Sequence, residues 1–293
     1  MSNAIIINPR SGRGRSRPAG GVRATLAEAV VRRVNVEAQV VVTREAGHAL
    51  ALARGFVDQG CDRVVAWGGD GTVNEVAGAL VGTGTALGIV ASGSGDGLAR
   101  GIRLPREPEA ALTLALQGAL SPFDVGFLGT RHFLNIAGIG FDAAVGDEFN
   151  RRGRYGAFSY LGYAARMVWT YPPTTYQLRL DANESSGPRF VVAFANARQY
   201  GNGLVLSADA DPSDGWLNSI IVDDGPAWRQ IWRARRLGLG STKPAEGIHR
   251  RRVQSASVSG DPLICHVDGE TFRTSGTLEV SLRPGALKIA SRE

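Results

Sequence analysis

Cysteine and histidine are scarce in this sequence. Its 293 residues include two cysteines, Cys61 and Cys265, which lie far apart and form no C-x-x-C pair. A disulfide framework and a thiolate zinc site are therefore excluded, and we expect both cysteines in the core. The four histidines show no metal-ligand spacing, so we expect them at the surface or as capping residues.

Long hydrophobic runs are also absent. The longest uncharged stretch, Val76–Gly95, is repeatedly interrupted by glycine, which a membrane-spanning helix of about 20 apolar residues would not be. Near the start of the chain, Ile5–Ile7 follows Met1 without a basic segment or a long apolar core. The sequence therefore predicts neither a transmembrane helix nor a secretory signal, and it favours a cytoplasmic protein.

Lysine is almost missing. Only Lys243 and Lys288 are lysines, so 31 of the 33 basic residues are arginines, and the net charge is +6. Because the guanidinium group suits phosphate oxygens, acidic phosphate ligands or an anionic membrane surface are reasonable partners. A genomic arginine bias is the alternative explanation. The arginines are scattered and no recognition module is visible, so we expect no nucleic-acid partner.

The first part of the chain predicts an α/β domain with a parallel sheet. Short β-branched runs alternate with Ala- and Leu-rich helical patterns, and this wiring requires crossover helices between parallel strands. The predicted strands are Ile5–Asn8, Glu37–Val42, Arg63–Ala66 and Ala86–Val90, and the predicted helices are Pro18–Val34, Ala46–Gln59, Thr72–Leu80 and Glu107–Gln117.

The pattern changes at Ser121-Pro122 to short strands separated by Gly, Pro and Asp turns. We therefore predict a nucleotide-binding domain at residues 1–121 and an antiparallel β-sandwich domain at residues 122–293. The predicted strands are Phe133–Ile136, Tyr176–Leu180, Phe190–Ala195, Leu217–Val222, Val253–Val258, Leu263–Val267 and Leu278–Leu282, and the predicted helices are Phe158–Thr170 and Trp228–Leu239.

A glycine-rich loop follows the third predicted strand. Gly68-Gly69-Asp70-Gly71-Thr72 leads through Val73 and Asn74 directly into a helix, so backbone N–H groups and the helix dipole can meet a phosphate. An aspartate repels a bare phosphate. Asp70 is therefore expected to hold Mg²⁺ or to take a proton from an attacking hydroxyl, unless it only caps the helix.

Two further loops of this kind follow other strands. The first strand ends in Asn8–Gly14 and the fourth in Ser92–Gly97. Because the carboxyl ends of parallel strands meet at one sheet edge, the three loops predict a nucleotide-sized site. The sequence G-x-x-x-x-G-K-[ST] is absent, so the fold is not that of a P-loop protein.

These motifs resemble those of the diacylglycerol kinase catalytic family, which includes bacterial lipid kinases and sphingosine kinases. The resemblance rests on Asn8-Pro9 with Ser11-Gly12, Gly68–Thr72 with Asn74-Glu75, Gly93-Ser94-Gly95, Phe133-Leu134-Asn135, Gly140–Ala143, Asn196–Gly203, Asp214-Gly215 and Val267–Glu270. It covers essentially the whole chain.

The resemblance implies an ATP-dependent lipid kinase that moves the γ-phosphoryl group to a hydroxyl of diacylglycerol or a related lipid. It implies catalytic roles for Asp70, Asp268 and Glu270, with the glutamate favoured as proton acceptor. It also implies Mg²⁺ at the Asp214 carboxylate and the carbonyls of Asp211 and Trp216. The implied ATP-binding residues are Asn8, Ser11, Gly12, Thr43, Gly68, Gly69, Gly71, Thr72, Asn74, Gly93 and Ser94.

Asp268 and Glu270 flank a single glycine. If Gly269 is extended, strand periodicity points both carboxylates to the same side, where one can hold a cation while the other accepts the hydroxyl proton. Many bacterial family members carry an acid at the position of Gly97 here. This departure leaves the identity of the lipid open.

Other functions remain open from the residues alone. An NAD kinase-like or phosphofructokinase-like enzyme shares the Gly-Gly-Asp-Gly motif, and a non-catalytic nucleotide- or lipid-binding regulator would tolerate Gly97. The sequence also leaves a homodimer open. In the predicted helix Trp228–Leu239, Trp228, Ile231 and Trp232 form one face and Arg229, Arg233, Arg235 and Arg236 another. This pattern fits an anionic membrane surface, with core packing as the alternative.

Overall fold

The computed structural model describes residues 2–12, 20–152, 157–201 and 204–291. Several predicted features fall outside these ranges, namely the arginine at position 13, the glycine at 14, the start of the first predicted helix at 18–19, and residues 202–203 of one motif. The chain forms two compact units, one of Met1–Phe123 with Gly285–Glu293 and one of Asp124–Pro284.

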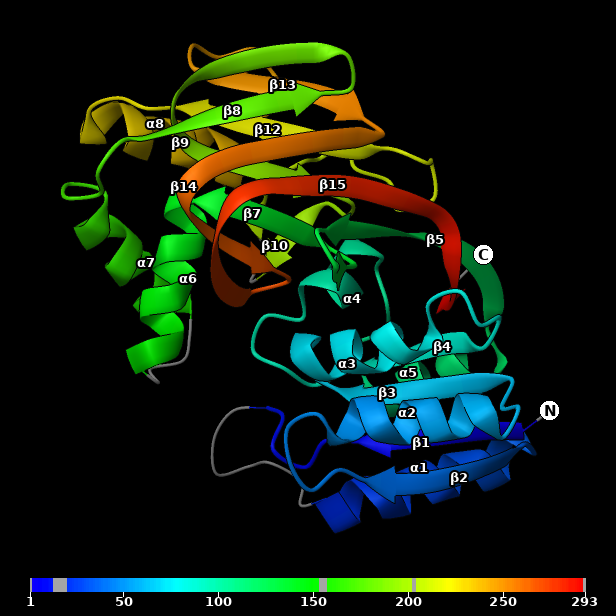
Figure 1. The fold of residues 1–293 in the computed structure, drawn as a ribbon. Coiled ribbons are helices and arrows are strands. Elements are labelled where there is room, and N and C mark those ends of the chain that lie inside the picture. Colours follow the sequence, from blue (N-terminus) through cyan, green and yellow to red (C-terminus); the bar gives the residue numbers. More distant parts are fainter. Residues whose placement is uncertain (1, 13–19, 153–156, 202–203, 292–293) are drawn as a thin grey trace. The chain divides into compact units, whose positions relative to one another are not determined.

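The first unit contains a parallel sheet in the order β4-β3-β1-β2, visible in Figure 1. Its strands are β1 (Ser2–Ile7), β2 (Glu37–Val42), β3 (Arg63–Gly68) and β4 (Ala86–Ala91). Every second residue of β1 and β3, such as Ile5 and Val65, faces one helix layer. The C-terminal part of β15 adds to the β4 edge, where Lys288 pairs in parallel with Ala86.

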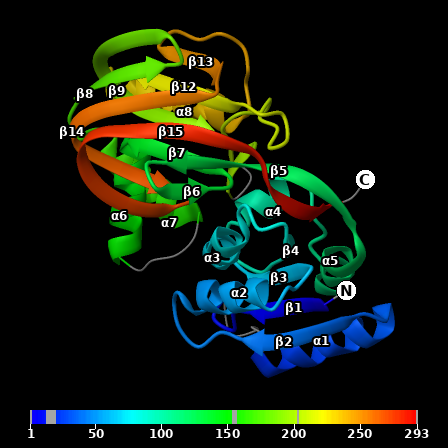
Figure 2. The same ribbon diagram turned by 45° about the vertical axis from the view of Figure 1, so that its right-hand side comes forward.

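Helices cover this sheet. They are α1 (Gly20–Val34), α2 (His48–Asp58), α3 (Asp70–Leu80), the short α4 (Gly97–Gly101) and α5 (Pro108–Gln117). α1 and α5 pack Ala27, Val30 and Leu112 against one face. The chain reverses its direction across the sheet after β2, so right-handed crossovers place α2 and α3 on the other face. Figure 2 shows these layers from a second direction.

The second unit is mostly antiparallel. Its strands follow the order β13-β12-β9-β7-β14-β15, β8 pairs with both β9 and β14, and β5 pairs with β15 and β6. The bounds are β5 (Ala119–Leu128), β6 (Arg131–Phe133), β7 (Ile136–Gly140), β8 (Thr174–Leu180), β9 (Asn183–Ala195), β10 (Gln199–Gly201), β11 (Leu204–Val205), β12 (Leu217–Asp223), β13 (Ile248–Val253), β14 (Ser255–Val267) and β15 (Glu270–Ser291).

Residues from many of these strands enclose one core, which includes Phe133, Tyr176, Phe194, Leu263 and Cys265. Three helices complete the unit, namely α6 (Phe141–Arg152), α7 (Ala157–Met167) and α8 (Ala227–Gly238). Both cysteines are buried, as predicted. No helix in the described part of the chain is long and apolar enough to cross a membrane.

Several details differ from the sequence prediction. The predicted strand Phe133–Ile136 is interrupted between β6 and β7, and two predicted strands merge into β14. The predicted second domain runs to residue 293, whereas residues 285–293 belong to the first unit. That difference arises because β15 is long enough to pair with β14 and then with β4.

Two side chains also depart from their predicted places. His266 is buried rather than exposed, and its Nε2 lies 3.1 Å from Asp142 Oδ2. A Cβ at Gly138 would collide with both groups, so glycine is required there. Arg233 of α8 is buried as well, and the predicted basic face of that helix is wrong at this residue.

Candidate functional site

The three glycine-rich loops are numbered in chain order, so the first follows β1 (Asn8–Gly12), the second follows β3 (Gly68–Thr72) and the third follows β4 (Ser92–Gly97). The first two loops meet between β1 and β3, where the crossovers leave the sheet in opposite directions. Ligands of open α/β sheets bind at this switch point. Asn8 Nδ2 donates a hydrogen bond of 2.8 Å to Thr72 Oγ1, and Asn8 Oδ1 accepts one of 2.9 Å from the backbone N–H of Arg10. At Gly68 any Cβ would collide with the Thr72 side chain. The loops are therefore joined by specific contacts.

The third loop packs closely against the second. A Cβ at Gly93 would lie 2.8 Å from the Gly69 Cα and 2.7 Å from Asp96 Oδ1, and one at Gly95 would lie 3.2 Å from Asp70 Oδ2. The loops approach this closely because glycine has no side chain. Asp70 is the first residue of α3, so its carboxylate lies where the helix dipole favours negative charge.

Ser11 is held by a buried arginine that the sequence analysis did not single out. Arg23 Nη1 donates hydrogen bonds of 2.8 Å to Ser11 Oγ and to the Asn8 carbonyl, and Nη2 donates one of 2.9 Å to the Ser11 carbonyl. Ser11 Oγ also lies 2.7 Å from Ser92 Oγ. Arg23 thus links the first loop to α1 and, through Ser11, to the third loop.

A sequence signal for Arg23 exists. Arg23, Ala27 and Val30 are the buried residues of α1, and their spacing places them on one helix face. An arginine in an otherwise apolar stripe needs buried acceptors. The loop carbonyls at the end of β1 supply them.

Asp96 closes the third loop on itself. Its backbone lies in the left-handed region, with φ of 47°, and its Oδ1 accepts a 2.7 Å hydrogen bond from the Gly93 N–H. Burial raises the pKa of the Asp96 carboxyl, and the Gly93 hydrogen bond and the charges of Arg100 and Arg106 oppose that shift. The next residue, Gly97, is buried and begins α4.

The other expected nucleotide-binding residues lie around these loops. Thr43 directly follows β2, is buried, and donates its backbone N–H to the Ile7 carbonyl at 2.8 Å. Gly12 has a φ of 102°, which favours glycine. Ser94 is exposed at the tip of the third loop. Gly71, Thr72 and Asn74 form the first turns of α3.

In the second unit, Asp268 and Gly269 form the tight turn between β14 and β15. Their φ values are 48° and 90°, a pair typical of a type I′ hairpin turn. The expectation that Gly269 is extended is therefore wrong. Strand periodicity does not place the Asp268 and Glu270 carboxylates on the same side.

The Asp268 carboxylate accepts three backbone hydrogen bonds. Its Oδ2 accepts the Leu134 N–H at 2.8 Å, and its Oδ1 accepts the N–H groups of Asn135 and Ile136 at 2.9 Å each. These bonds explain why the predicted strand at 133–136 is interrupted. Glu270, by contrast, is exposed at the start of β15.

The Asp211–Trp216 turn carries the expected metal ligands. Asp214 Oδ1 accepts the Trp216 N–H at 3.0 Å, and Oδ2 lies 2.6 Å from Arg252 Nη2. Asp211 Oδ1 accepts hydrogen bonds from the N–H and the hydroxyl of Ser213. We therefore expect the backbone carbonyl of Asp211, rather than its carboxylate, to bind the metal. The ligand set is all oxygen, as Mg²⁺ prefers, although Arg252 competes for Asp214.

Within the described residues, no group of three or more His, Cys, Asp and Glu side chains could hold a metal ion. A site at this turn would therefore depend mainly on carbonyl oxygens, which suits a hard cation that keeps several waters.

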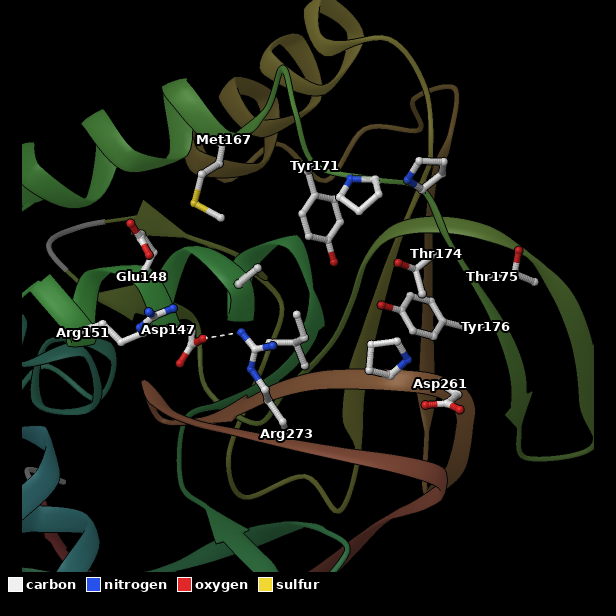
Figure 3. Close-up of a pocket in the computed structure, with 15 residues that line it drawn as sticks. Asp147, Glu148, Arg151, Met167, Tyr171, Thr174, Thr175, Tyr176, Asp261 and Arg273 are labelled. Carbon is white, nitrogen blue, oxygen red and sulfur yellow. Dashed lines mark hydrogen bonds and ion pairs between the residues drawn. The ribbon is translucent and has the colours of Figure 1, made fainter.

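A cavity of about 600 Å³ opens in the second unit beside α6 and α7 (Figure 3). Met167, Tyr171, Pro172 and Ile264 contribute apolar surface. The lining also includes charged residues, among them an ion pair of 2.7 Å between Arg273 Nη2 and Asp147 Oδ2. Further lining residues are Ala144, Glu148, Arg151, Pro173, Thr174, Thr175, Tyr176, Asp261 and Pro262. No local sequence pattern indicates this cavity, because its lining comes from four separated segments, 144–151, 167–176, 261–264 and 273.

Comparison with known proteins gives consistent matches. Residues 3–128 match the family described as "Diacylglycerol kinase catalytic domain", and residues 135–291 match the "YegS C-terminal NAD kinase beta sandwich-like domain". The chain is 34% identical over 274 residues to "Probable lipid kinase YegS-like" of Chromohalobacter salexigens, covering 90% of this chain and 86% of that protein.

Two further relatives cover nearly the whole chain. "Diacylglycerol kinase" of Mycobacterium tuberculosis is 28% identical over 293 residues, covering 97% of this chain and 93% of that protein. A crystal structure of a diacylglycerol kinase from Bacillus anthracis superimposes with a TM-score of 0.78 at 18% identity, covering 99% of this chain and 96% of that one. At that identity the structural match concerns the fold alone.

Proposed function

We propose, from the premise that this chain belongs to the diacylglycerol kinase catalytic family, that it transfers the γ-phosphoryl group of ATP to a hydroxyl of diacylglycerol or a related lipid. Relatives that match nearly its whole length are named lipid kinases, and the chain is a lipid kinase of that family. The observation that carries the finer proposal is the position of Asp70, at a helix N-terminus among glycine-rich loops.

The loops of the first unit supply what phosphoryl transfer requires, which is mostly positioning and charge neutralisation. Backbone N–H groups of Gly69 and Gly71 would donate to phosphate oxygens, and the α3 dipole would add positive potential. Asn8, Ser11, Gly12, Thr43, Gly68, Thr72, Asn74 and Ser94 would line the nucleotide. Bound Mg²⁺ would neutralise phosphate charge, with Asp70 as its protein ligand or as the group that orients the hydroxyl.

Glu270 is the proposed proton acceptor for the lipid hydroxyl. Glu270 is exposed to solvent at the start of β15, which supports this choice, and the Asp268 carboxylate accepts three backbone N–H groups. We assign to Asp268 the structural role of holding the backbone of residues 134–136, and any catalytic role of this residue is secondary. The cavity beside α6 and α7 would take the apolar part of the lipid, since Met167, Tyr171 and Ile264 contribute apolar surface to it.

The proposal is tested by incubating the purified protein with γ-labelled ATP, Mg²⁺ and a mixed lipid extract, with NAD in a parallel reaction. A labelled phospholipid is expected. Labelled NADP instead would establish the NAD kinase alternative, and no product from either acceptor would favour a non-catalytic regulator. Asp70→Asn should abolish transfer without changing the fold, while Asp58→Asn, an exposed carboxylate of α2, serves as the matched control.

A further inference from the structure

Helix α8 has its apolar side turned outward. Trp228, Ile231 and Trp232 are 62%, 48% and 47% exposed, and their spacing places them on one helix face. The residues that face inward are Gln230, Arg233 and Leu237. A surface helix normally buries its apolar stripe. The reversed orientation of α8 therefore requires a structural explanation, and its exposed apolar face indicates a binding role.

The cause lies in the contacts of the buried polar side chains. Arg233 Nη1 donates to the Asp223 carbonyl at 2.7 Å and Nε donates to the Glu246 carbonyl at 3.1 Å, while Gln230 Nε2 donates to the Asp223 carbonyl at 2.9 Å. A Cβ at Gly247 would collide with the Arg233 guanidinium. Rotating the tryptophans inward would break these bonds and bury unpaired carbonyls, which is costly.

The outward face is also cationic. The Arg229 guanidinium lies 5.2 Å from the centre of the Trp228 ring, and that of Arg236 lies 4.9 Å from the centre of the Trp232 ring. Arg235 is exposed on the same face as the tryptophans. No acidic residue occurs in Ala227–Gly238, although Glu246 Oε1, from the segment before β13, lies 3.5 Å from Arg229 Nη1. Leu239, which follows the helix, is 77% exposed and extends the apolar stripe.

We propose that this face of α8, formed by Trp228, Ile231, Trp232, Arg229, Arg235 and Leu239, binds the surface of an anionic lipid bilayer. Tryptophan and arginine together suit the headgroup region, where the rings enter the apolar boundary and the guanidinium groups meet lipid phosphates. A second copy of the chain is a poorer occupant, because a two-fold contact would bring arginines against arginines. The proposal rests on the proposed function only in that a lipid substrate lies in a membrane.

The test measures binding without ATP or catalysis, so its failure is distinguishable from failure of the proposed function. Wild-type protein is sedimented with phosphatidylglycerol-containing vesicles and with pure phosphatidylcholine vesicles. We expect binding to the anionic vesicles that weakens with salt. Trp228→Ala with Trp232→Ala should lower the apparent affinity by on the order of tenfold or more, since binding scales with the apolar area inserted.

Arg229→Gln with Arg235→Gln should cause a similar loss on anionic vesicles and little change on neutral ones. Matched controls in the first unit are Val22→Ala with Leu120→Ala, which are exposed apolar residues, and Arg32→Gln with Arg54→Gln, which are exposed arginines. Equal losses in control and α8 variants would overturn the proposal. So would absence of vesicle binding, or a wild-type dimer that the double tryptophan variant converts to monomer.

Discussion

The Asn8 side-chain amide donates a 2.8 Å hydrogen bond to Thr72 Oγ1, across 64 positions of sequence. This bond joins the loop after β1 to the first turn of α3. On the β1 side, the Asn8 carbonyl accepts from the buried Arg23 guanidinium. A series of polar contacts therefore holds the site, so its glycine loops are already positioned before a ligand binds.

Arg23→Leu tests this arrangement. The variant removes the donors to the Asn8 carbonyl and to both oxygens of Ser11, so the free energy of unfolding should fall by about 3 kcal/mol, the scale of one or two charge-assisted hydrogen bonds. The KM for ATP should also rise when it is measured well below the temperature of unfolding, where the variant is still folded. Arg32→Leu, at an exposed position of the same helix, should change neither quantity appreciably. An unchanged KM in Arg23→Leu would remove Arg23 from the positioning of Ser11.

Local patterns in the sequence predicted much of the first unit. The predicted strand Glu37–Val42 agrees in both bounds, and Arg63–Ala66 differs only at its end, because β-branched runs bounded by loops depend on neighbouring residues. The Asp268 turn shows where local reasoning fails. The N–H groups of Leu134, Asn135 and Ile136 bond to a carboxylate more than 130 residues away, and no periodicity in either segment indicates it.

Helix α8 shows a different limit. The helical period correctly groups Trp228, Ile231 and Trp232 on one face. The predicted basic face is wrong at Arg233, which is buried, and at Arg235, which lies on the face of the tryptophans. The usual rule that the apolar face is buried would also give the wrong orientation. The orientation depends on carbonyl groups at Asp223 and Glu246, which become acceptors only after β12 and β13 are in place. Tertiary contacts therefore determine which face of α8 is buried, and the helical period alone does not.

Asp96→Asn should change the pH dependence of stability. Burial raises the pKa of Asp96 above its ordinary value of 3.8, so the folded protein binds a proton more strongly than the unfolded chain does. Wild-type stability should therefore fall as the pH rises from that value through the raised folded pKa. Asparagine keeps an Oδ1 acceptor for the Gly93 N–H, tolerates positive φ and carries no charge.

The melting temperature of Asp96→Asn should consequently gain on the wild type as the pH rises from 3.8 through the raised folded pKa of Asp96. Thermal unfolding at several pH values in that window measures the difference. Asp58→Asn, with the same chemical change at an exposed site, is the control. Parallel curves for Asp96→Asn and the wild type would contradict the assigned burial cost.

Asp214→Ala should remove a Mg²⁺-dependent gain in stability. Without nucleotide, the wild type should melt at a higher temperature in Mg²⁺, since a ligand at 100 times its Kd stabilises by about 2.7 kcal/mol. The variant should lose this response in addition to the contacts of Asp214 with Trp216 and Arg252. Arg252→Gln is the informative control, because it removes the ion pair but keeps the carboxylate. It should retain the response to Mg²⁺, and a wild type indifferent to Mg²⁺ would eliminate the site.

Asp268→Asn and Glu270→Gln should separate stability from catalysis. In Asp268→Asn an amide nitrogen or a neutral oxygen faces the N–H groups of residues 134–136, so the free energy of unfolding should fall by about 2 kcal/mol, the cost of unpaired buried donors. Glu270→Gln changes an exposed side chain and should melt like the wild type. Its turnover should fall on the order of 10²-fold, the usual loss of a general base.

Rate measurements across pH distinguish the two roles further. A general base must be ionised, so the wild-type rate should rise with pH on the acidic side, and Glu270→Gln should lose that rise because glutamine does not titrate. Asp268→Asn should keep it at a reduced rate. Glu279→Gln, an exposed glutamate of the same strand, should behave like the wild type in both measurements. Full turnover in Glu270→Gln would exclude this residue as the base, and normal melting with lost turnover in Asp268→Asn would transfer the role to Asp268.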